Sequence, residues 1–201
     1  KYRTFCGSVV FTPPAVIDGI YKIVQQLGFK GGRVLDPSMG HGNFFGAMPT
    51  KLRKNCMLRG VEKDSLAGGM AQQLYQDASV EVTGFENAFL DNNGYDLVIS
   101  NVPFNRDIHP IDADFKAYNF NLHNYFFAKA LQKVRPGGLI AFITSEETMK
   151  NGGAKLREYI SKRADFICAV KLPDTTFKSY ADTSVTSDLI ILQKRDENGS
   201  P

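Results

Sequence analysis

Apolar positions along the chain follow two spacings, one typical of helices and one typical of buried strands. Between residues 16 and 27 they recur every three or four positions, which predicts an amphipathic helix that ends at Gly28. Residues 33–36 form a short apolar run typical of a strand, and the glycine-rich loop behind it opens a helix near Asn43. The pattern therefore predicts a strand, loop and helix unit directly after the first helix.

The same alternation continues along the rest of the sequence. Further strands are expected at residues 57–62, 79–84, 95–100, 139–144, 165–172 and 187–194, and further helices at 65–76, 122–134 and 154–163. Strands that alternate with helices indicate a parallel sheet covered on both faces. The last two strands have no helical pattern between them, so we expect an antiparallel hairpin. The predicted fold is an α/β, Rossmann-like, doubly wound domain with a seven-stranded, mostly parallel sheet.

Length and composition favour one globular domain. The 201 residues are 43% hydrophobic and 22% charged, which is enough for one substantial core and too little for two large ones. We expect a single domain over residues 1–201, with an N-terminal motif and helix in 1–28 and a catalytic core in 33–194. Because the sequence begins at Lys1 rather than at a methionine and ends in polar, turn-rich residues, we interpret it as part of a longer protein.

Charge and cysteine content restrict the partners. A formal net charge of +3 permits a nucleic-acid partner, but it is below the dense positive field expected where phosphate contacts alone provide the binding. The three cysteines are far apart and the histidines lack metal-ligand spacing, so neither a disulfide framework nor a metal site is expected. No apolar run approaches the roughly 18 residues of a membrane span. We expect a cytoplasmic protein with no membrane partner and no metal.

The loop after the first strand, DPSMGHGNF, suits a cationic ligand that has no phosphate. In an open α/β sheet the ligand lies beyond the carboxyl ends of the strands, near this loop. Gly40 and Gly42 let the backbone approach a ligand, while Phe45 replaces the third glycine of a dinucleotide motif. Asp36 would repel a diphosphate, which disfavours NAD or ATP and favours S-adenosylmethionine. Glu62, at the end of the second strand, can accept both ribose hydroxyls. Taken alone, Asp36 or Glu62 can equally be a capping or solvated acid, but the two together with this loop between them favour the ligand site.

The stretch SNVPF, residues 100–104, would face the same crevice. A planar NH2 group is a poor nucleophile because its lone pair is delocalised, and two acceptors aimed at its hydrogens favour the transition state. Asn101 offers a side-chain oxygen, and Val102 offers a carbonyl that Pro103 biases to an extended conformation. Phe104 offers a face on which a base can stack. Taken alone, the stretch is also typical of an ordinary turn around a buried phenylalanine.

The motifs and their order resemble those of S-adenosylmethionine-dependent, adenine-specific (N6) DNA methyltransferases of the gamma group. FTPP (11–14) resembles the motif that contacts the methionine part of the cofactor, VEKD (61–64) the motif with the ribose-binding acid, and SNVPF the catalytic Asn-Pro-Pro-Tyr/Phe tetrapeptide. GFENA (84–88) stands where the family holds an acid near the cofactor's adenine. The resemblance implies the class I methyltransferase fold, S-adenosylmethionine as cofactor and DNA as partner.

The resemblance also implies roles for individual residues. The implied cofactor-binding residues are Thr12, Pro13, Asp36, Pro37, Gly40, Gly42, Glu62, Lys63, Glu86 and Asn87. The implied catalytic residues are Asn101, Val102, Pro103 and Phe104. Phe104 and Phe177 are expected to hold the adenine between two rings after it turns out of the duplex.

The resemblance extends from residue 11 to residue 194. Within the family, the chain resembles the subgroup found in large phage or mobile-element proteins with helicase modules. Two features depart from the family. Val102 replaces the second residue of the tetrapeptide, usually proline, and leaves its carbonyl less firmly held. The seven residues given after Lys194 are too few for a separate target-recognition domain, so sequence selectivity is expected to come from additional domains or a subunit, or to be loose.

The leading hypothesis is methyl transfer to the N6 amine of adenine in DNA, of the restriction-modification type. One alternative is another planar amine, namely cytosine N4, an RNA base or a protein glutamine. The FTPP start and the LPDTTF hairpin (172–177) favour DNA adenine among these. An alternative from another class is a catalytically silent module that binds S-adenosylmethionine and DNA within a larger protein.

Overall fold

The computed structural model describes residues 12–105, 107–148, 153–173 and 187–196. Its strands form one seven-stranded sheet in the order β3-β2-β1-β4-β5-β7-β6. The strands are β1 Gly32–Asp36, β2 Cys56–Glu62, β3 Ser79–Val82, β4 Tyr95–Asn101, β5 Val134–Ser145, β6 Ala164–Leu172 and β7 Ser187–Lys194. The first five pair in parallel, whereas β7 pairs antiparallel with both β5 and β6. The predicted fold class is confirmed, including the antiparallel hairpin.

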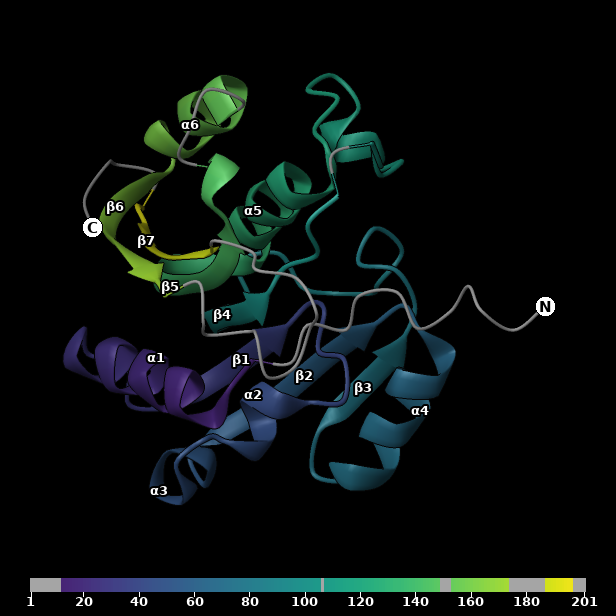
Figure 1. The fold of residues 1–201 in the computed structure, drawn as a ribbon, viewed down its shortest axis with the longest axis vertical. Helices are drawn as coiled ribbons and strands as arrows, with labels where there is room; N and C mark the ends of the chain where they lie inside the picture. The colour runs from purple at the N-terminus through teal and green to yellow at the C-terminus, as the bar shows by residue number, and fades with distance from the viewer. Residues whose placement is uncertain (1–11, 106, 149–152, 174–186, 197–201) are drawn as a thin grey trace.

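Helices cover both faces of the sheet (Figure 1). The helices are α1 Pro14–Gln26, α2 Asn43–Gly46, α3 Thr50–Arg53, α4 Ser65–Leu74, α5 Leu122–Lys133 and α6 Ala154–Ser161, with short 3-10 turns at Ala113–Phe115 and Glu146–Thr148. Figure 1 shows α1 to α4 on one side of the strands and α5 with α6 on the other. None of the helices described is both long and apolar enough to cross a membrane.

Each central strand contributes side chains to two separate cores, because neighbouring residues of a strand point to opposite faces. In β1, Val34 belongs to the core under α1, and Leu35 belongs to the core under α5. In β5, Leu139 and Ala141 face the first core, while Ile140 faces the second. Every central strand is therefore apolar on both faces, which explains why these strands read as continuous apolar runs.

The boundary between α5 and β5 differs from the prediction. The helix was expected to reach residue 134 and the strand to begin at residue 139, but α5 ends at Lys133 and β5 begins at Val134. Pro136 cannot continue a helix, and Val134 already has an extended conformation with φ −70° and ψ 142°. Val134 pairs with Tyr95, so the sequence RPGG lies within a strand as an irregularity. The short α3 was not predicted.

Lys194, the last residue of β7, holds the carboxyl end of α5. Its ammonium group donates hydrogen bonds to the backbone oxygens of Leu131 at 2.6 Å and Val134 at 2.9 Å. It also donates to the side-chain oxygen of Asn93 at 2.5 Å. The last carbonyls of a helix have no partner within the helix, and a cation there also opposes the negative end of the helix dipole. The contact therefore fastens α5 to the sheet.

We expect Lys194→Met to lower the free energy of unfolding by about 1–3 kcal/mol, because it leaves part-buried carbonyls without a charged donor. The measurement is urea unfolding followed by circular dichroism. Lys162→Met is the matched control, since Lys162 pairs with Glu158 on an exposed helix surface and surface substitutions usually change stability by less than about 0.5 kcal/mol. Equal unfolding midpoints for both variants would contradict the capping role.

Candidate active site

The carboxyl ends of β1, β2 and β4 lie at one edge of the sheet, where the order of strands reverses between β1 and β4. Ligands of open α/β sheets bind at this kind of switch point. Asp36, Glu62 and Asn101 are the last residues of these three strands. Because the strands are parallel, the two acids predicted to bind the cofactor, Asp36 and Glu62, lie at the same edge as the predicted catalytic residue Asn101.

Asp36 is fully buried, and only one of its two carboxylate oxygens has a partner among the residues described. Its Oδ1 atom accepts hydrogen bonds from the hydroxyl of Ser100 at 2.7 Å and from the backbone N–H of Ser38 at 3.2 Å. Burial raises the pKa of Asp36 from 3.8 to about 7, although both hydrogen bonds oppose the shift. A buried carboxylate with an unpartnered oxygen attracts a cationic ligand group and repels a phosphate.

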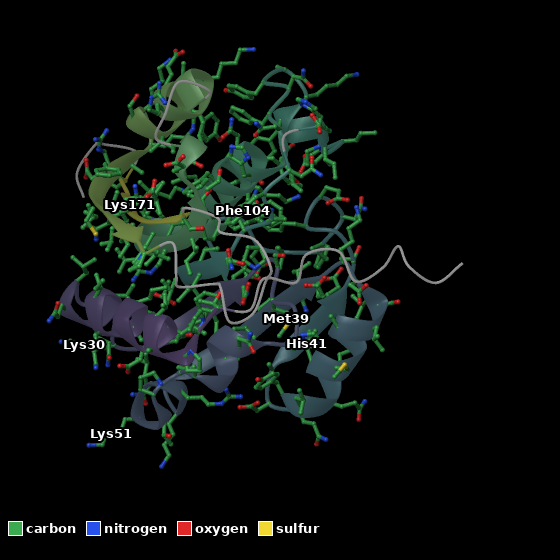
Figure 2. All side chains as sticks on the ribbon, viewed as in Figure 1. Lys30, Met39, His41, Lys51, Phe104 and Lys171 are labelled. Atoms are coloured by element: carbon green, nitrogen blue, oxygen red, sulfur yellow. The ribbon has the colours of Figure 1, made fainter. Side chains whose placement is uncertain are left out.

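The backbone of the loop after β1 adopts conformations, and lies close to a neighbouring side chain, in a way that only glycine readily permits. Gly40 and Gly42 have φ angles of 54° and 85°, in the left-handed region. A Cβ atom at Gly42 would lie 2.2 Å from the ring of Tyr75. The loop is fixed to β2 by a 3.0 Å hydrogen bond from Met39 N–H to the carbonyl of Val61. Figure 2 shows Met39 and His41 on this loop, leading into α2.

Glu62 holds the same loop from the neighbouring strand. Its carboxylate accepts one hydrogen bond from the backbone N–H of Gly40 and one from that of Asp64, both at 2.7 Å. Asp64 in turn caps α4 by accepting from the N–H of Ala67 at 2.8 Å. A carboxylate has about four acceptor positions, so Glu62 keeps capacity for two hydroxyl groups while two backbone donors fix its orientation.

Asn101 contacts the segment that precedes α1. Its amide nitrogen donates to the hydroxyl oxygen of Thr12 at 3.2 Å, and Thr12 is buried. The two residues are 89 positions apart in the sequence. The sequence predicted Thr12 as a cofactor residue, and the structure adds a direct contact with the predicted catalytic amide. The contact directs the amide nitrogen toward Thr12 and therefore the amide oxygen away from it.

Val102 continues the sheet beyond Asn101. Its N–H donates to the carbonyl of Ile143 at 3.0 Å, and its side chain is 1% exposed. The carbonyl of Val102 was expected to be less firmly held than that of the usual proline. The hydrogen bond to Ile143 offsets this, because a proline at this position would have no N–H to donate.

Phe104, which was expected to offer a face for base stacking, is half-buried and packs against both cores. Figure 2 shows it near the ends of β4 and β5, above the loop that carries Met39. Phe177, its predicted partner in base stacking, lies outside the described residues. The remaining predicted residues differ in burial: Pro13 and Pro103 are half-buried, Pro37 is buried and Asn87 is exposed.

Glu86 lies in the loop between β3 and β4. This loop contains a turn, which is closed by a 2.9 Å hydrogen bond from Asn87 N–H to the carbonyl of Gly84. The carboxylate of Glu86 is 3.8 Å from the ammonium of Lys63, whose side chain is 80% exposed. A Cβ atom at Gly84 would lie 2.3 Å from Glu86 Oε1, so a side chain there would displace the Glu86 carboxylate from its present position. Two predicted cofactor residues from different loops are thus neighbours.

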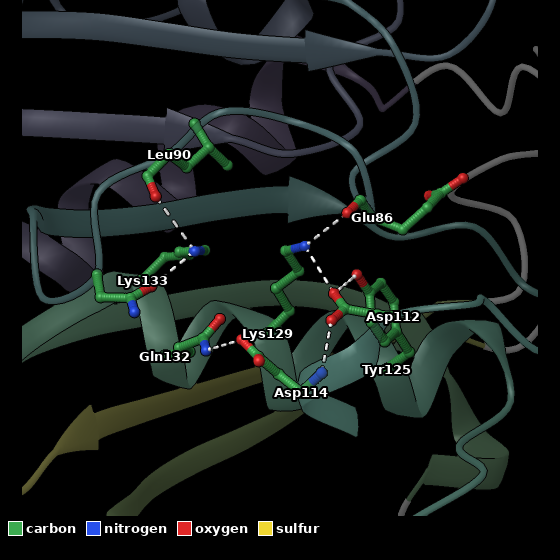
Figure 3. Close-up of polar contacts among 9 residues, drawn as sticks. Glu86, Leu90, Asp112, Asp114, Tyr125, Lys129, Gln132 and Lys133 are labelled. Atoms are coloured by element: carbon green, nitrogen blue, oxygen red, sulfur yellow. Dashed lines mark hydrogen bonds and ion pairs between the residues drawn. The ribbon is translucent and has the colours of Figure 1, made fainter. Parts of the chain in front are cut away.

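Sequence reasoning missed Ser100 and a buried group on α5. Lys129 donates to the backbone oxygen of Glu86 at 3.1 Å and to the carboxylate of Asp112 at 2.8 Å (Figure 3). The signal was present, because a lysine within the apolar run YFFAKAL must have a partner when that face is buried.

A cavity of about 340 Å³ lies between α6, β6 and β7, away from the predicted residues, none of which lines it. Within the described part of the chain there is also no group of three or more metal-ligating side chains. Asp36, Glu62 and Asn101 lie instead at the edge formed by the carboxyl ends of β1, β2 and β4.

Comparison with known proteins identifies similar chains. The family described as Eco57I restriction-modification methylase matches residues 49–177. The defense against restriction protein B of Escherichia phage P1 is 31% identical over 195 residues, which cover 94% of this chain and 8% of that protein. The type II methyltransferase M.XamI of Xanthomonas campestris pv. amaranthicola is 28% identical, covering 92% of this chain and 39% of that protein. The chain spans less than half of either relative.

A solved structure from Listeria monocytogenes, assigned as a class I S-adenosylmethionine-dependent methyltransferase, has the same fold. Its TM-score is 0.79 at 22% sequence identity, and the match covers 95% of this chain and 62% of that chain. The likeness supports the architecture found here.

The raised pKa of Asp36 predicts how stability depends on pH. Because the pKa in the folded chain lies above the ordinary value of 3.8, the folded protein holds an extra proton between about pH 4 and pH 7. The free energy of unfolding therefore falls as pH rises through this window, by roughly a few kcal/mol. We expect Asp36→Asn to remove the decline, measured by urea unfolding at pH 5 and pH 8.

The control is Asp18→Asn, which replaces a carboxylate whose side chain is 49% exposed on α1. It should keep the pH dependence of the wild type. Equal slopes in the wild type and in Asp36→Asn would contradict the titration of a buried carboxyl at this edge.

Proposed function

The chain belongs to the Eco57I restriction-modification methylase family, and on that premise we propose that it transfers the methyl group of S-adenosylmethionine to the N6 amine of adenine in DNA. The observation that carries the proposal is the pair of adjacent residues Ser100 and Asn101. Ser100 bonds the buried carboxylate of Asp36, and Asn101 bonds Thr12. One residue of β4 thus serves the cofactor side, and the next serves the amine side.

Residues of the loops hold the cofactor in this proposal. The unpartnered oxygen of Asp36 accepts from the cationic amine, and Glu62 accepts from the ribose hydroxyls. Gly40 and Gly42 would let the backbone approach the cofactor, and Glu86 would contact the adenine of the cofactor. S-adenosylmethionine supplies an electrophilic methyl group when bound. The absence of a phosphate in that cofactor agrees with the buried acid at the end of β1.

Asn101 and Val102 orient the amine of the substrate. The amide oxygen of Asn101 and the carbonyl of Val102 accept its two N–H groups, which favours a tetrahedral nitrogen and disperses the positive charge that develops on it. The hydrogen bond from Val102 N–H to Ile143 supports this geometry by fixing the backbone. No general base is required, because the proton becomes acidic once the nitrogen is alkylated.

The flipped base lies between Phe104 and Phe177 in this proposal. Phe104 suits the role because both cores hold it, so that little side-chain freedom is lost on stacking. We also propose that target recognition depends on additional domains or a subunit. The support is that the chain spans 8% of the phage relative and 39% of M.XamI.

We expect Asn101→Ala to reduce methyl transfer to DNA about 10²- to 10³-fold, the usual effect of removing one group that stabilises developing charge. The measurement is incorporation of tritiated methyl groups into single- and double-stranded DNA by the full-length protein, with mapping of the modified base. Asn55→Ala is the control, because Asn55 is exposed and precedes β2 at the opposite edge. Equal labelling by wild type and Asn101→Ala would refute the clamp, and methylcytosine would redirect the substrate to cytosine N4.

We expect Thr12→Val to lower kcat roughly tenfold, in addition to any loss of cofactor affinity that follows from its predicted cofactor contact, because valine keeps the shape of threonine but cannot accept the hydrogen bond from Asn101. Steady-state kinetics and calorimetry with S-adenosylmethionine separate the two effects. A weakened cofactor affinity at unchanged kcat would instead assign Thr12 to cofactor binding alone.

A further inference from the structure

Lys129 is a cation buried beneath the loops that surround the site. Its side chain is 6% exposed, and that of its partner Asp112 is 9% exposed, with 2.8 Å between ammonium and carboxylate. The same ammonium donates to the backbone oxygen of Glu86 at 3.1 Å. Figure 3 shows it reaching from α5 between these two groups. One side chain thus contacts the loop before β4 and the segment that follows Phe104.

Asp112 has hydrogen-bond partners on both carboxylate oxygens. Its Oδ2 atom accepts from the hydroxyl of Tyr125 at 2.7 Å as well as from Lys129, and its Oδ1 atom accepts from the N–H of Asp114 at 3.0 Å. Burial alone would raise the pKa of Asp112, but the bonds from Lys129, Tyr125 and Asp114 bring it below its ordinary value. The segment around Asp112 is therefore held to α5 by an ionised carboxylate.

Aromatic rings complete the surroundings of the ammonium. It lies 5.3 Å from the ring centroid of Phe85 and 5.6 Å from that of Tyr125. Phe85 precedes Glu86 in the chain and packs edge-on against Tyr125 at 6.1 Å. These contacts orient the cation toward the Glu86 loop.

A second lysine, one helical turn later, contacts the same loop at its other end. Lys133 donates to the backbone oxygen of Leu90 at 3.2 Å and to the side chain of Asn92 at 2.7 Å. Among the described residues Lys133 makes no hydrogen bond or ion pair with Asp112, although the two opposite charges attract each other at longer range (Figure 3). The two lysines therefore offer a matched pair, since both hold the loop between β3 and β4 but only Lys129 bonds Asp112.

Stability alone gives little reason for a buried ion pair, because apolar residues of similar volume often stabilise a fold as well or better. The ion pair instead fixes the positions of the segments that it joins, since each hydrogen bond requires a particular placement of its partner. We propose that Lys129 is a positioning residue that links the Glu86 loop to residues 107–121, so that the cofactor side and the substrate side of the site depend on the same ammonium. The identity of what those two sides bind rests on the proposed function.

Hydrogen exchange of the full-length protein tests the link without any ligand. Lys129→Met should speed exchange in residues 84–90 and in residues 107–118 together, while the sheet keeps its protection. Lys133→Met should affect only the loop between β3 and β4, and Lys162→Met, on the exposed face of α6, should affect neither. The link is refuted if Lys129→Met loosens one segment without the other, or the whole domain equally.

Ligand binding separates positioning from mere stabilisation. The double variant Lys129→Met with Asp112→Leu removes both charges and is expected to recover most of the stability lost in Lys129→Met. We still expect roughly tenfold weaker S-adenosylmethionine binding in both variants by calorimetry, the equivalent of one lost hydrogen bond to a charged group. Wild-type affinity in the double variant would show that the pair only stabilises. If the wild type does not bind S-adenosylmethionine, the proposed function fails, and hydrogen exchange alone decides the link.

Discussion

The hydrogen bond from Ser100 to Asp36 joins β4 to β1 at the point where the strand order reverses. It satisfies one oxygen of a carboxylate whose pKa burial raises to about 7 in spite of this bond, and it leaves the other oxygen without a partner among the described residues. An unpaired buried charge is costly, so the fold gives up stability at this edge. A cationic group placed at that oxygen, such as the amine of the proposed cofactor, would recover part of that cost.

The site lies where the two cores meet. Side chains of β1, β4 and β5 alternate between the two cores, and this alternation fixes the register in which the strands pair. The register in turn fixes the position of each strand's last residue at the edge of the sheet. Phe104 contacts both cores directly after the strand ends. The residues proposed to act on a substrate are consequently placed by rigid packing, whereas the loops around them are placed by a small number of polar contacts.

Local patterns were sufficient to predict the architecture. Alternating strands and helices determine the parallel sheet, and a parallel sheet determines that Asp36, Glu62 and Asn101 share an edge. The bond between Asn101 and Thr12 was beyond such reasoning, because it joins side chains 89 positions apart through tertiary packing. The start of β5 was missed because a proline and two glycines interrupt the apolar run, although the backbone still pairs with β4. The roles of the individual site residues stay predictions.

The place of β7 has a consequence for how the chain folds during synthesis. Among the described residues β7 is the strand that comes last along the chain, yet it lies between β5 and β6, and there it is the one strand with which β6 pairs. Until the ribosome has released the chain through Lys194, β6 has no strand to pair with and β5 has an open edge. The sheet described here therefore stays incomplete until the eight residues of β7 have been synthesised and can pair between β5 and β6. The same strand brings Lys194 to the end of α5, so that sheet closure and helix capping occur in one step.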